Sequence, residues 1–567
     1  FLPVVFIAEE AGQLYSDIAI AISASILVSM LVAITVIPTA SARLKFDGTS
    51  ADNIEHSRLR QAVIGRIEWL LASATRRLYC IGFTVATSLA IVLLLTPPAE
   101  YLPEGEEAKT FASMNAPPGY NLATMQEIAR EIQDYFMPFV NPEADSGSSA
   151  SETGDIPVMK YFIISISPQR LRIIAETKDP REIDELMTAI VRKYESYPGM
   201  RAFATRGSII SSNDGGTRSV NLDISGANLA DLYQVARTAY SRAQAIFDAP
   251  NIQTQPTSLS LAQPLLEVRP KWERAAEVGM SAEDIGFAVA ALTDGAFVNE
   301  FFLDDDKIDI YLYNKQGPEA TIETLAQIFI YTPTGAVLPL SELAEIAETV
   351  DTATVRRIDG RRTVTLNIIP PRSVALETGV EKVRTELVQH MRDQGQVPLG
   401  VSMDISGAAD QLDATRASLG NNYLVALAII YLLMVAIFAH WGYPLLIMTT
   451  IPLGIAGGIA GLALLNLTGA VLRGMGLEGF HQPFDMISML GFLILMGTVV
   501  NNPILIVHRA ISNLQEDGMD PVEAVQEAVD SRLRPIAIST ITTICGLAPL
   551  VFLPGAGTEL YRGVGVM

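Results

Sequence analysis

Cysteine, positive charge and metal-binding motifs are scarce in this sequence of 567 residues. Its two cysteines, Cys80 and Cys545, both lie in apolar runs, which excludes a disulfide framework. The chain has no CxxC pair and no cluster of His and Cys, so we expect no metal site. Lys and Arg number 40 against 62 Asp and Glu, and the net charge of -22 argues against nucleic acid as a partner, because phosphate binding needs a basic face.

Motifs of catalytic sites are missing as well. No Walker A glycine loop is present, which excludes ATP hydrolysis by that route, and neither GxSxG nor HExxH occurs. We therefore expect a protein that is not an enzyme and that uses no cofactor.

Long apolar runs are abundant: 49% of the residues are hydrophobic, and the mean hydropathy is +0.30. About 20 apolar residues cross a bilayer as a helix. Six runs meet this length, at 16–37, 79–96, 421–439, 444–465, 484–507 and 535–552. A polar stretch from about 97 to 419, with soluble patterning, separates the second run from the third.

Basic residues in the short loops predict the orientation of these spans. The loops 38–78 and 508–534 carry ten Lys and Arg, whereas segments 1–15, 466–483 and 553–562 carry two. The ten are Arg43, Lys45, Arg58, Arg60, Arg66, Arg76, Arg77, Arg509, Arg532 and Arg534. We expect the basic loops to face the cytoplasm and the polar stretch to lie on the outer side.

The polar stretch is expected to be α+β. Strand patterns alternate with amphipathic helices, as in TFASMNAPPGYNLATMQEIAREIQDYF and in SVNLDISG followed by NLADLYQVARTAYSRAQAIF. These β-α-β units are typical of split ferredoxin-like modules. The predicted domains are 1–97 and 420–567 in the membrane, with 98–259, 260–330 and 331–419 outside it.

Two stretches near the chain's ends resemble one another. VVFIAEEAGQLYSDIAIAI contains Tyr15, and LVFLPGAGTELYRGVGV contains Tyr561, 546 residues later. The pattern predicts one period of a two-fold repeat, taken from a longer protein with two similar halves. Parallel repeats of this kind are common in transporters.

An amide pair inside an apolar run is the first candidate functional feature. In GTVVNNPILIV, Asn501 lies eight residues from Arg509, which places it about 12 Å into the membrane. Its amide cannot face lipid cheaply. Hydroxyl residues of the next span share that depth, so we predict an intramembrane polar cluster of Asn501, Asn502, Ser539, Thr540 and Thr543. Helix–helix hydrogen bonding alone would also explain it.

The whole chain resembles the resistance–nodulation–division (RND) efflux permeases. The resemblance rests on FLPVVFIAEEAGQLYSDIAIAI, TPPAEYLPEGEEAKTFASMNAPPGYN, GMSAEDIGFAVAALTDGAFVNEF, GTVVNNPILIV and RLRPIAISTITTICGLAPLVF, in that order. It implies a chain that runs from the end of the fifth helix to the start of the twelfth. It also implies periplasmic ferredoxin-like porter subdomains and a docking subdomain near 260–330.

The function implied by the resemblance is proton-driven export. Such a permease sits in the inner membrane of a Gram-negative bacterium and exports hydrophobic or amphiphilic compounds. It works as a homotrimer with a periplasmic adaptor protein and an outer-membrane channel. Two alternatives remain open: a metal-cation exporter of the same superfamily, and a non-transporting sensory or secretion relative.

The resemblance also suggests roles for individual residues. The helix with Asn501 would contribute to a proton relay completed by adjacent aspartates on the matching helix of the other half. Multidrug members have a lysine where this chain has Asn501, so Asn501 would position the acids and not titrate. Arg532 would lie on the proton path or act as a positive-inside anchor. Phe203 matches a position that lines the drug pocket, and Phe297 is a weaker candidate for substrate contact; both are also explained as structural residues.

Overall fold

The computed structural model describes residues 10–43, 58–102, 108–141, 156–207, 218–247, 250–293, 295–315, 321–352, 354–475, 481–553 and 556–567. Residues 1–9 and Lys45, on which the internal similarity and the charge count partly rest, lie outside these ranges. The chain divides into two compact units. The first takes Phe1–Asn115, Leu122–Thr257 and Arg357–Met567, and the second takes Ala116–Asn121 and Ser258–Arg356.

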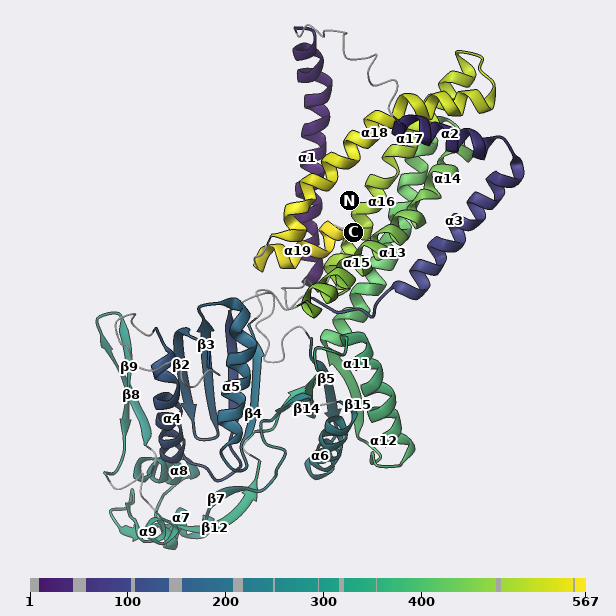
Figure 1. The fold of residues 1–567 in the computed structure, drawn as a ribbon. Helices are drawn as coiled ribbons and strands as arrows, with labels where there is room; N and C mark the ends of the chain where they lie inside the picture. The colour runs from purple at the N-terminus through teal and green to yellow at the C-terminus, as the bar shows by residue number, and fades with distance from the viewer. Residues whose placement is uncertain are drawn as a thin grey trace. The chain divides into compact units, whose positions relative to one another are not determined.

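Six helical segments of the described chain are long and apolar enough to cross a membrane, and each overlaps one of the six predicted runs. They are α1 (Glu10–Ser41), α3 (Ala74–Leu95), α13 (Ala408–Phe438), α14 (Gly442–Met448) with α15 (Thr450–Gly474), α16 (Met486–Val499) with α17 (Asn501–Gln515), and α18 (Pro521–Phe552). Two further helices, α2 (Arg58–Leu71) and α19 (Ala556–Val566), accompany them (Figure 1). The basic stretch 38–78, predicted as a loop, therefore contains a helix.

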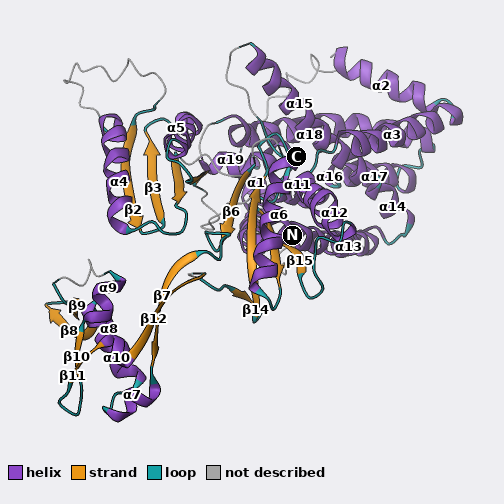
Figure 2. Cartoon of the chain, turned by 90° about the horizontal axis from the view of Figure 1, so that it is seen from below, coloured by secondary structure: helices purple, strands orange, loops and turns teal. Residues whose placement is uncertain are grey.

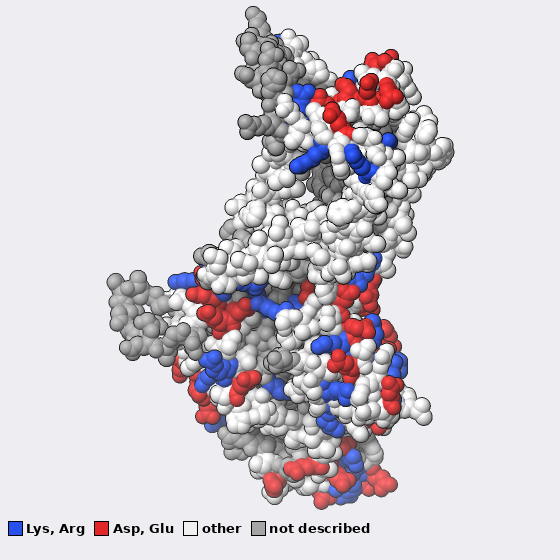
Figure 3. Space-filling model, turned by 45° about the vertical axis from the view of Figure 1, so that its right-hand side comes forward, with Lys and Arg blue, Asp and Glu red and all other residues white. Residues whose placement is uncertain are grey.

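The surface of these helices is that of a membrane protein. Helix α3 has no buried residue, and its apolar side chains are exposed along its length. Figure 3 shows a broad band of helical surface almost free of charged side chains, with Lys, Arg, Asp and Glu gathered beyond its ends. Exposed apolar surface of this extent is stable when lipid covers it.

Small residues of α15 let neighbouring helices approach closely. A Cβ atom on Gly454 would lie 3.0 Å from Val499 of α16, and one on Gly458 would lie 3.2 Å from Phe492. Close approach at small residues is typical of helix packing in membranes.

Four strands and two main helices form the first soluble module. Its elements are β1 (Lys109–Asn115), α4 (Leu122–Phe136), η3 (Met137–Phe139), β2 (Met159–Ser167), β3 (Arg170–Thr177), η4 (Pro180–Glu182), α5 (Ile183–Glu195) and β4 (Arg201–Arg206). The antiparallel sheet has the order β2-β3-β1-β4. Apolar faces of the helices pack on it, α4 against β2 and α5 against β1 and β4.

A second soluble module repeats this arrangement. Its elements are β5 (Val220–Ser225), α6 (Leu229–Ile246), β6 (Asn251–Gln255), β13 (Arg357–Ile358), β14 (Arg361–Ile369), α11 (Leu376–Lys382), η7 (Val383–Gln389), α12 (His390–Asp393) and β15 (Ser402–Gly407). Strand β14 pairs with β5 and β6, and β5 also pairs with β15, all antiparallel. In both modules the four principal strands follow the spatial order second, third, first, fourth.

The second unit is inserted into this module, between β6 and β13. A long antiparallel pair, β7 (Gln263–Pro270) with β12 (Ala344–Asp351), forms its stem (Figure 2). Between them lie α7 (Trp272–Glu277), α8 (Ala282–Leu292), the hairpin β8 (Ala296–Leu303) with β9 (Asp306–Leu312), α9 (Ile322–Gln327), β10 (Phe329–Tyr331), β11 (Val337–Pro339) and α10 (Leu340–Leu343). Its own apolar core includes Met280, Ile285, Leu340 and Leu343.

Strand pairing sets module limits that differ from the predicted ranges. The range 98–259 joins β5 and β6 to the first sheet, whereas they pair with β14, and 260–330 stops short of β12. The physical reason is that β6 and β14 belong to one sheet although about a hundred residues separate them, a relation that local patterns do not carry.

Candidate functional site

The predicted polar cluster falls on two neighbouring helices. Asn501 and Asn502 open α17, and α17 packs against α18, which carries Ser539, Thr540 and Thr543. Asn501 and the three hydroxyl residues are exposed, and Asn502 is partly buried. Thr543 donates its hydroxyl hydrogen to the carbonyl of Ser539, 2.9 Å away, on its own helix. Within the described residues no hydrogen bond joins the two amides to these hydroxyls.

The helix changes character beside the amides. The span is divided at Val500, where α16 ends and α17 begins. Pro503 has no N–H to donate to the carbonyl of Val499, which weakens the helix at this point. The division at Val500 lies three residues before Pro503.

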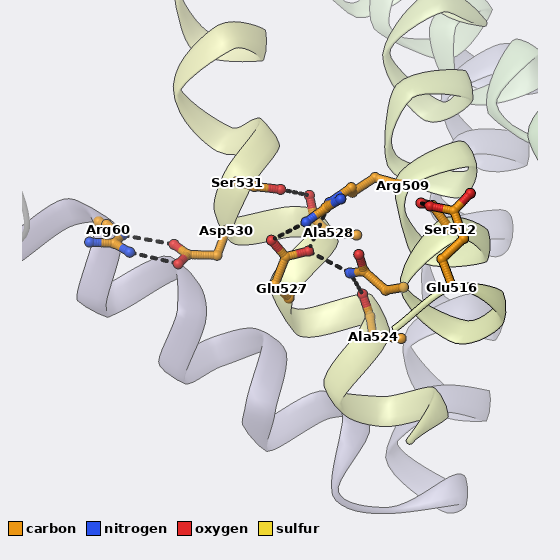
Figure 4. Close-up of polar contacts among 10 residues, drawn as sticks. Arg60, Arg509, Ser512, Glu516, Ala524, Glu527, Ala528, Asp530 and Ser531 are labelled. Carbon is orange, nitrogen blue, oxygen red and sulfur yellow. Dashed lines mark hydrogen bonds and ion pairs between the residues drawn. The ribbon is translucent and has the colours of Figure 1, made fainter. Parts of the chain in front are cut away.

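Ionic contacts instead join α17 to the first turns of α18 (Figure 4). Arg509 donates two hydrogen bonds to Glu527, at 3.1 and 3.0 Å. The Asn513 amide donates to the same carboxylate and to the carbonyl of Ala524. These contacts fix the separation of the two helices at this end.

The same end of α18 also holds helix α2. Arg60 of α2 donates two hydrogen bonds to Asp530, at 2.7 and 2.6 Å. Two residues further on, Arg532 is partly buried, and its Nε has no hydrogen-bond partner among the described residues. The ion pair of Arg60 and Asp530 thus lies two residues along the chain from Arg532, whose Nε has no acceptor within the described residues.

A second polar site, which was not among the predicted site residues, lies at the start of α16. Asp485 is fully buried and caps the helix, accepting from the Ser488 backbone N–H at 2.7 Å and its hydroxyl at 2.8 Å. Gln482 donates to the other carboxylate oxygen at 3.1 Å. Asp485 precedes the first residue of the span. Burial raises its pKa to about 6, and the nearby Glu100 adds to the rise.

The signal for Asp485 was present in the sequence. An aspartate just before an apolar helix, followed three residues later by a serine, is a typical N-cap pattern. What the pattern could not show is its burial, which depends on residues brought in from 99–101.

Residues 98–102, which we term the junction segment, run alongside the start of α16. Ala99 bridges Phe484 in parallel, Glu100 donates its N–H to the Phe484 carbonyl at 2.9 Å, and Met486 donates to the Tyr101 carbonyl at 3.1 Å. The segment follows α3 and leads toward β1, so it connects a span to the first soluble module.

The junction segment is also tied to the second soluble module by a buried ion pair. Arg218, just before β5, donates to Glu100 at 3.3 and 3.2 Å. Arg218 also donates to the carbonyl of Val374, which follows β14, at 2.7 Å. Glu100 is 8% exposed and Arg218 is 7% exposed, so both charges are removed from water.

A third set of contacts reaches α11 and α13. Ala99 donates to the Glu377 carboxylate at 2.7 Å, and Glu377 returns its own N–H to the Ala99 carbonyl at 3.1 Å. Arg416 of α13 donates to Glu377 at 2.8 Å. This hydrogen bond holds the pKa of Glu377 below its ordinary value. The junction segment thus contacts α16, α11 and the approach to β5 at once.

A cavity of about 640 Å³ opens beside this segment. Apolar Val380, Leu412 and Phe484 line it together with the charged residues Glu377, Glu381, Arg384, Asp413 and Arg416. A wall of this mixed character suits a molecule that is apolar over part of its surface and polar or charged over the rest.

The two candidate substrate phenylalanines fall in different units. Phe203 of β4 is 4% exposed, paired with Ser113 in the first sheet, whereas Phe297 of β8 is 47% exposed in the second unit. Phe203 packs as a core residue. The part of the chain that the structure describes contains no group of three or more His, Cys, Asp or Glu side chains able to hold a metal ion.

Comparison with known proteins gives one family. The family model described as the AcrB/AcrD/AcrF family matches residues 1–567. The multidrug resistance protein MdtF of Escherichia coli strain K12 is 24% identical over 585 residues, covering 100% of this chain and 53% of that protein. MdtF of Escherichia coli O157:H7 is similar to the same extent. The chain thus spans about half the length of the curated relatives it matches.

Proposed function

The chain belongs to the AcrB/AcrD/AcrF family, and from this premise we propose that the complete protein is the inner-membrane permease of a proton-driven, three-part efflux system. Its substrates would be hydrophobic and amphiphilic compounds. The observation that carries the proposal is the match over the whole chain, together with six apolar helices joined to mixed α/β sheets.

The two soluble modules would be ferredoxin-like porter subdomains in the periplasm, and the second unit a docking subdomain. The strand order shared by the two modules supports the first assignment. The excess of basic residues in the loops 38–78 and 508–534 supports the orientation. The insertion of a separate compact unit into one porter module supports the assignment of that unit as a docking subdomain.

The partners would be two further copies of the protein, a periplasmic adaptor and an outer-membrane channel. The second unit offers apolar surface for such contacts. In the hairpin β8–β9, Phe301 is 54% exposed, Phe302 65% and Tyr311 53%. Isolated hairpins of this kind are marginal in water, and contact with a protein surface would stabilise them.

Coupling to protons would involve α16 and α17 without a carboxylate of their own. In the described spans, Asp and Glu lie within the first ten residues of α13 and α18 and at the start of α1, and α3, α15, α16 and α17 contain none, so the protonatable acids would come from the rest of the protein. Asn501 would hold those acids in position. The junction segment would carry movement of α16 to the second module through Glu100 and Arg218, because it is bonded to both.

The cavity beside the junction segment would admit amphiphilic substrates near the periplasmic surface of the inner membrane. Its lining combines apolar and charged side chains at the ends of α3, α13 and α16. This assignment follows from the position of the cavity at the ends of three spans. Phe203 and Phe297 stay candidates for substrate contact beside it.

The test is expression of the complete gene, together with the genes for its adaptor and outer-membrane channel, in a Gram-negative host without its own efflux pumps. Cells should accumulate less of a lipophilic fluorescent dye than cells with an empty vector, and a protonophore should abolish the difference. Equal accumulation at equal amounts of protein in the membrane would contradict the proposal. Efflux that persists with the protonophore would contradict the proton-driven mechanism.

A further inference from the structure

Three exposed arginines lie around the turn between α2 and α3. Arg60 of α2 is bound to Asp530, but Arg66, Arg76 and Arg77 are exposed, and no carboxylate in the described residues pairs with them. Between positions 66 and 77 the only opposing charge is Glu68. The turn therefore presents a net positive surface.

Arg76 is held in a defined position. Its guanidinium carbon lies 4.5 Å from the centroid of the Trp69 ring, and Nη1 donates to the Trp69 carbonyl at 3.0 Å. Stacking and a hydrogen bond together restrict a side chain that would otherwise be free, so less conformational entropy remains to be lost on binding an anion. Trp69 is itself 58% exposed.

The surface next to these arginines is apolar. Directly after Arg77, α3 presents Leu78 at 73% exposure, Tyr79 at 75% and Phe83 at 74%. Tryptophan, tyrosine and arginine at the end of an apolar span mark the level of lipid headgroups. A ligand at this turn would thus meet positive charge at one end and apolar helix at the other.

The turn rests on a fixed support. Helix α2 packs against both α18 and α3, and the paired hydrogen bonds from Arg60 to Asp530 anchor it (Figure 4). The arginines consequently keep their places relative to the apolar surface of α3.

We propose that Arg66, Arg76 and Arg77, with Trp69 orienting Arg76, form a binding site for the headgroup of an anionic phospholipid. The phosphate would accept hydrogen bonds from the guanidinium groups, which suit phosphate better than lysine does. The acyl chains would lie along α3. The residues of this site are distinct from those of the predicted polar cluster and of the junction segment.

The test is lipid binding to the complete protein purified in detergent. Phosphatidylglycerol and phosphatidylcholine with the same acyl chains are added, and bound lipid is counted by native mass spectrometry. The wild type should retain phosphatidylglycerol preferentially. The double variant Arg76→Gln/Arg77→Gln should weaken the binding of phosphatidylglycerol at least tenfold more than the control Arg43→Gln/Arg534→Gln does. The control removes the same number of positive charges from the same predicted side of the membrane.

A second variant separates a built site from general attraction of basic loops to anionic lipid. Trp69→Ala changes no charge and keeps the backbone carbonyl that Arg76 contacts, but it removes the ring stacked on Arg76. Phosphatidylglycerol binding should therefore fall several-fold, whereas Trp69→Phe, which keeps a ring, should retain it. Trp441→Ala, at another exposed tryptophan, is the matched control. Equal losses in the two double variants, or unchanged binding in Trp69→Ala, would overturn the proposal in favour of unspecific electrostatics.

Discussion

At position 501 the chain carries an amide that makes no hydrogen bond within the described residues, although it lies in an apolar span. Asn501 is exposed, and the neighbouring hydroxyl of Thr498 turns back to its own helix, 3.1 Å from the carbonyl of Leu495. An amide at this depth is costly unless it meets a polar partner. The partner would be supplied by the remainder of the protein.

Replacing this amide should therefore separate function from stability. Asn501→Ala should change the apparent melting temperature by less than about 2 °C, because no hydrogen bond within the described residues is lost. Proton-driven dye efflux should fall about fivefold if one hydrogen bond to a relay acid is removed. Thr498→Val is the control and should leave efflux unchanged. Full efflux in Asn501→Ala would show that the amide takes no part in coupling.

Asp485 poses the opposite situation, a polar group fully enclosed by the protein. Burial raises its pKa from 3.8 to about 6. A carboxyl whose pKa is raised on folding favours the folded state when protonated, and this contribution is lost as the pH rises through 6. The difference corresponds to about 3 kcal/mol.

The pH dependence of stability should report this group. Between pH 4 and pH 7 the melting temperature of the wild type should fall relative to that of Asp485→Asn, which cannot ionise. The matched control is Asp520→Asn, since Asp520 caps α18 by accepting from the Val522 N–H but is exposed to solvent. The same trend in both variants would assign the effect to caps in general and would contradict the role of burial.

At the scale of elements, the sequence was most informative where one local property decides the structure. Six runs of apolar residues became six membrane-length helices, because length and hydropathy suffice to specify a span. Helix α2 was not foreseen, since its 14 residues mix charge with apolar residues and its place depends on Arg60 meeting Asp530, 470 residues away. Module limits were misjudged for the same reason, because β14 pairs with β5 and β6 across an inserted unit.

The ion pair between α17 and α18 is an element-scale contact whose strength can be measured. Arg509 and Glu527 are each about one-third exposed, so solvent screens their attraction, while the double hydrogen bond and Asn513 strengthen it. A double-mutant cycle with Arg509→Gln and Glu527→Gln should give a coupling of about 1 kcal/mol in thermal unfolding. The exposed pair Arg384 and Glu381 should give a value near zero by the same cycle. A coupling no larger than that of the exposed pair would mean that this contact does not fix the helices.

At the scale of the whole molecule, the question is how a change inside the membrane reaches the soluble modules. The junction segment contacts the first turn of α16, the start of α11 and Arg218, which lies two residues before β5. These contacts of the junction segment could not be predicted from the sequence. Glu100 is one of several acidic residues in its stretch, and its partner Arg218 lies 118 residues away along the chain. The candidate relay residues, by contrast, were visible because polar residues in an apolar run are conspicuous.

The buried pair of Glu100 and Arg218 allows a structural role to be distinguished from a coupling role. Glu100→Gln or Arg218→Met alone leaves one charge buried without its counter-ion and should cost about 3–5 kcal/mol. The double variant Glu100→Gln/Arg218→Met removes both charges of the pair and should recover most of this stability, since neutral replacements of buried pairs are often tolerated. If the pair transmits motion from α16 to β5, the double variant should fold and reach the membrane but export dye several-fold more slowly than the wild type.

The control is Lys193→Gln/Glu131→Gln, which removes an ion pair at 2.8 Å within the first module and should leave export normal. A double variant that is stable and fully active would reduce the pair to a structural contact.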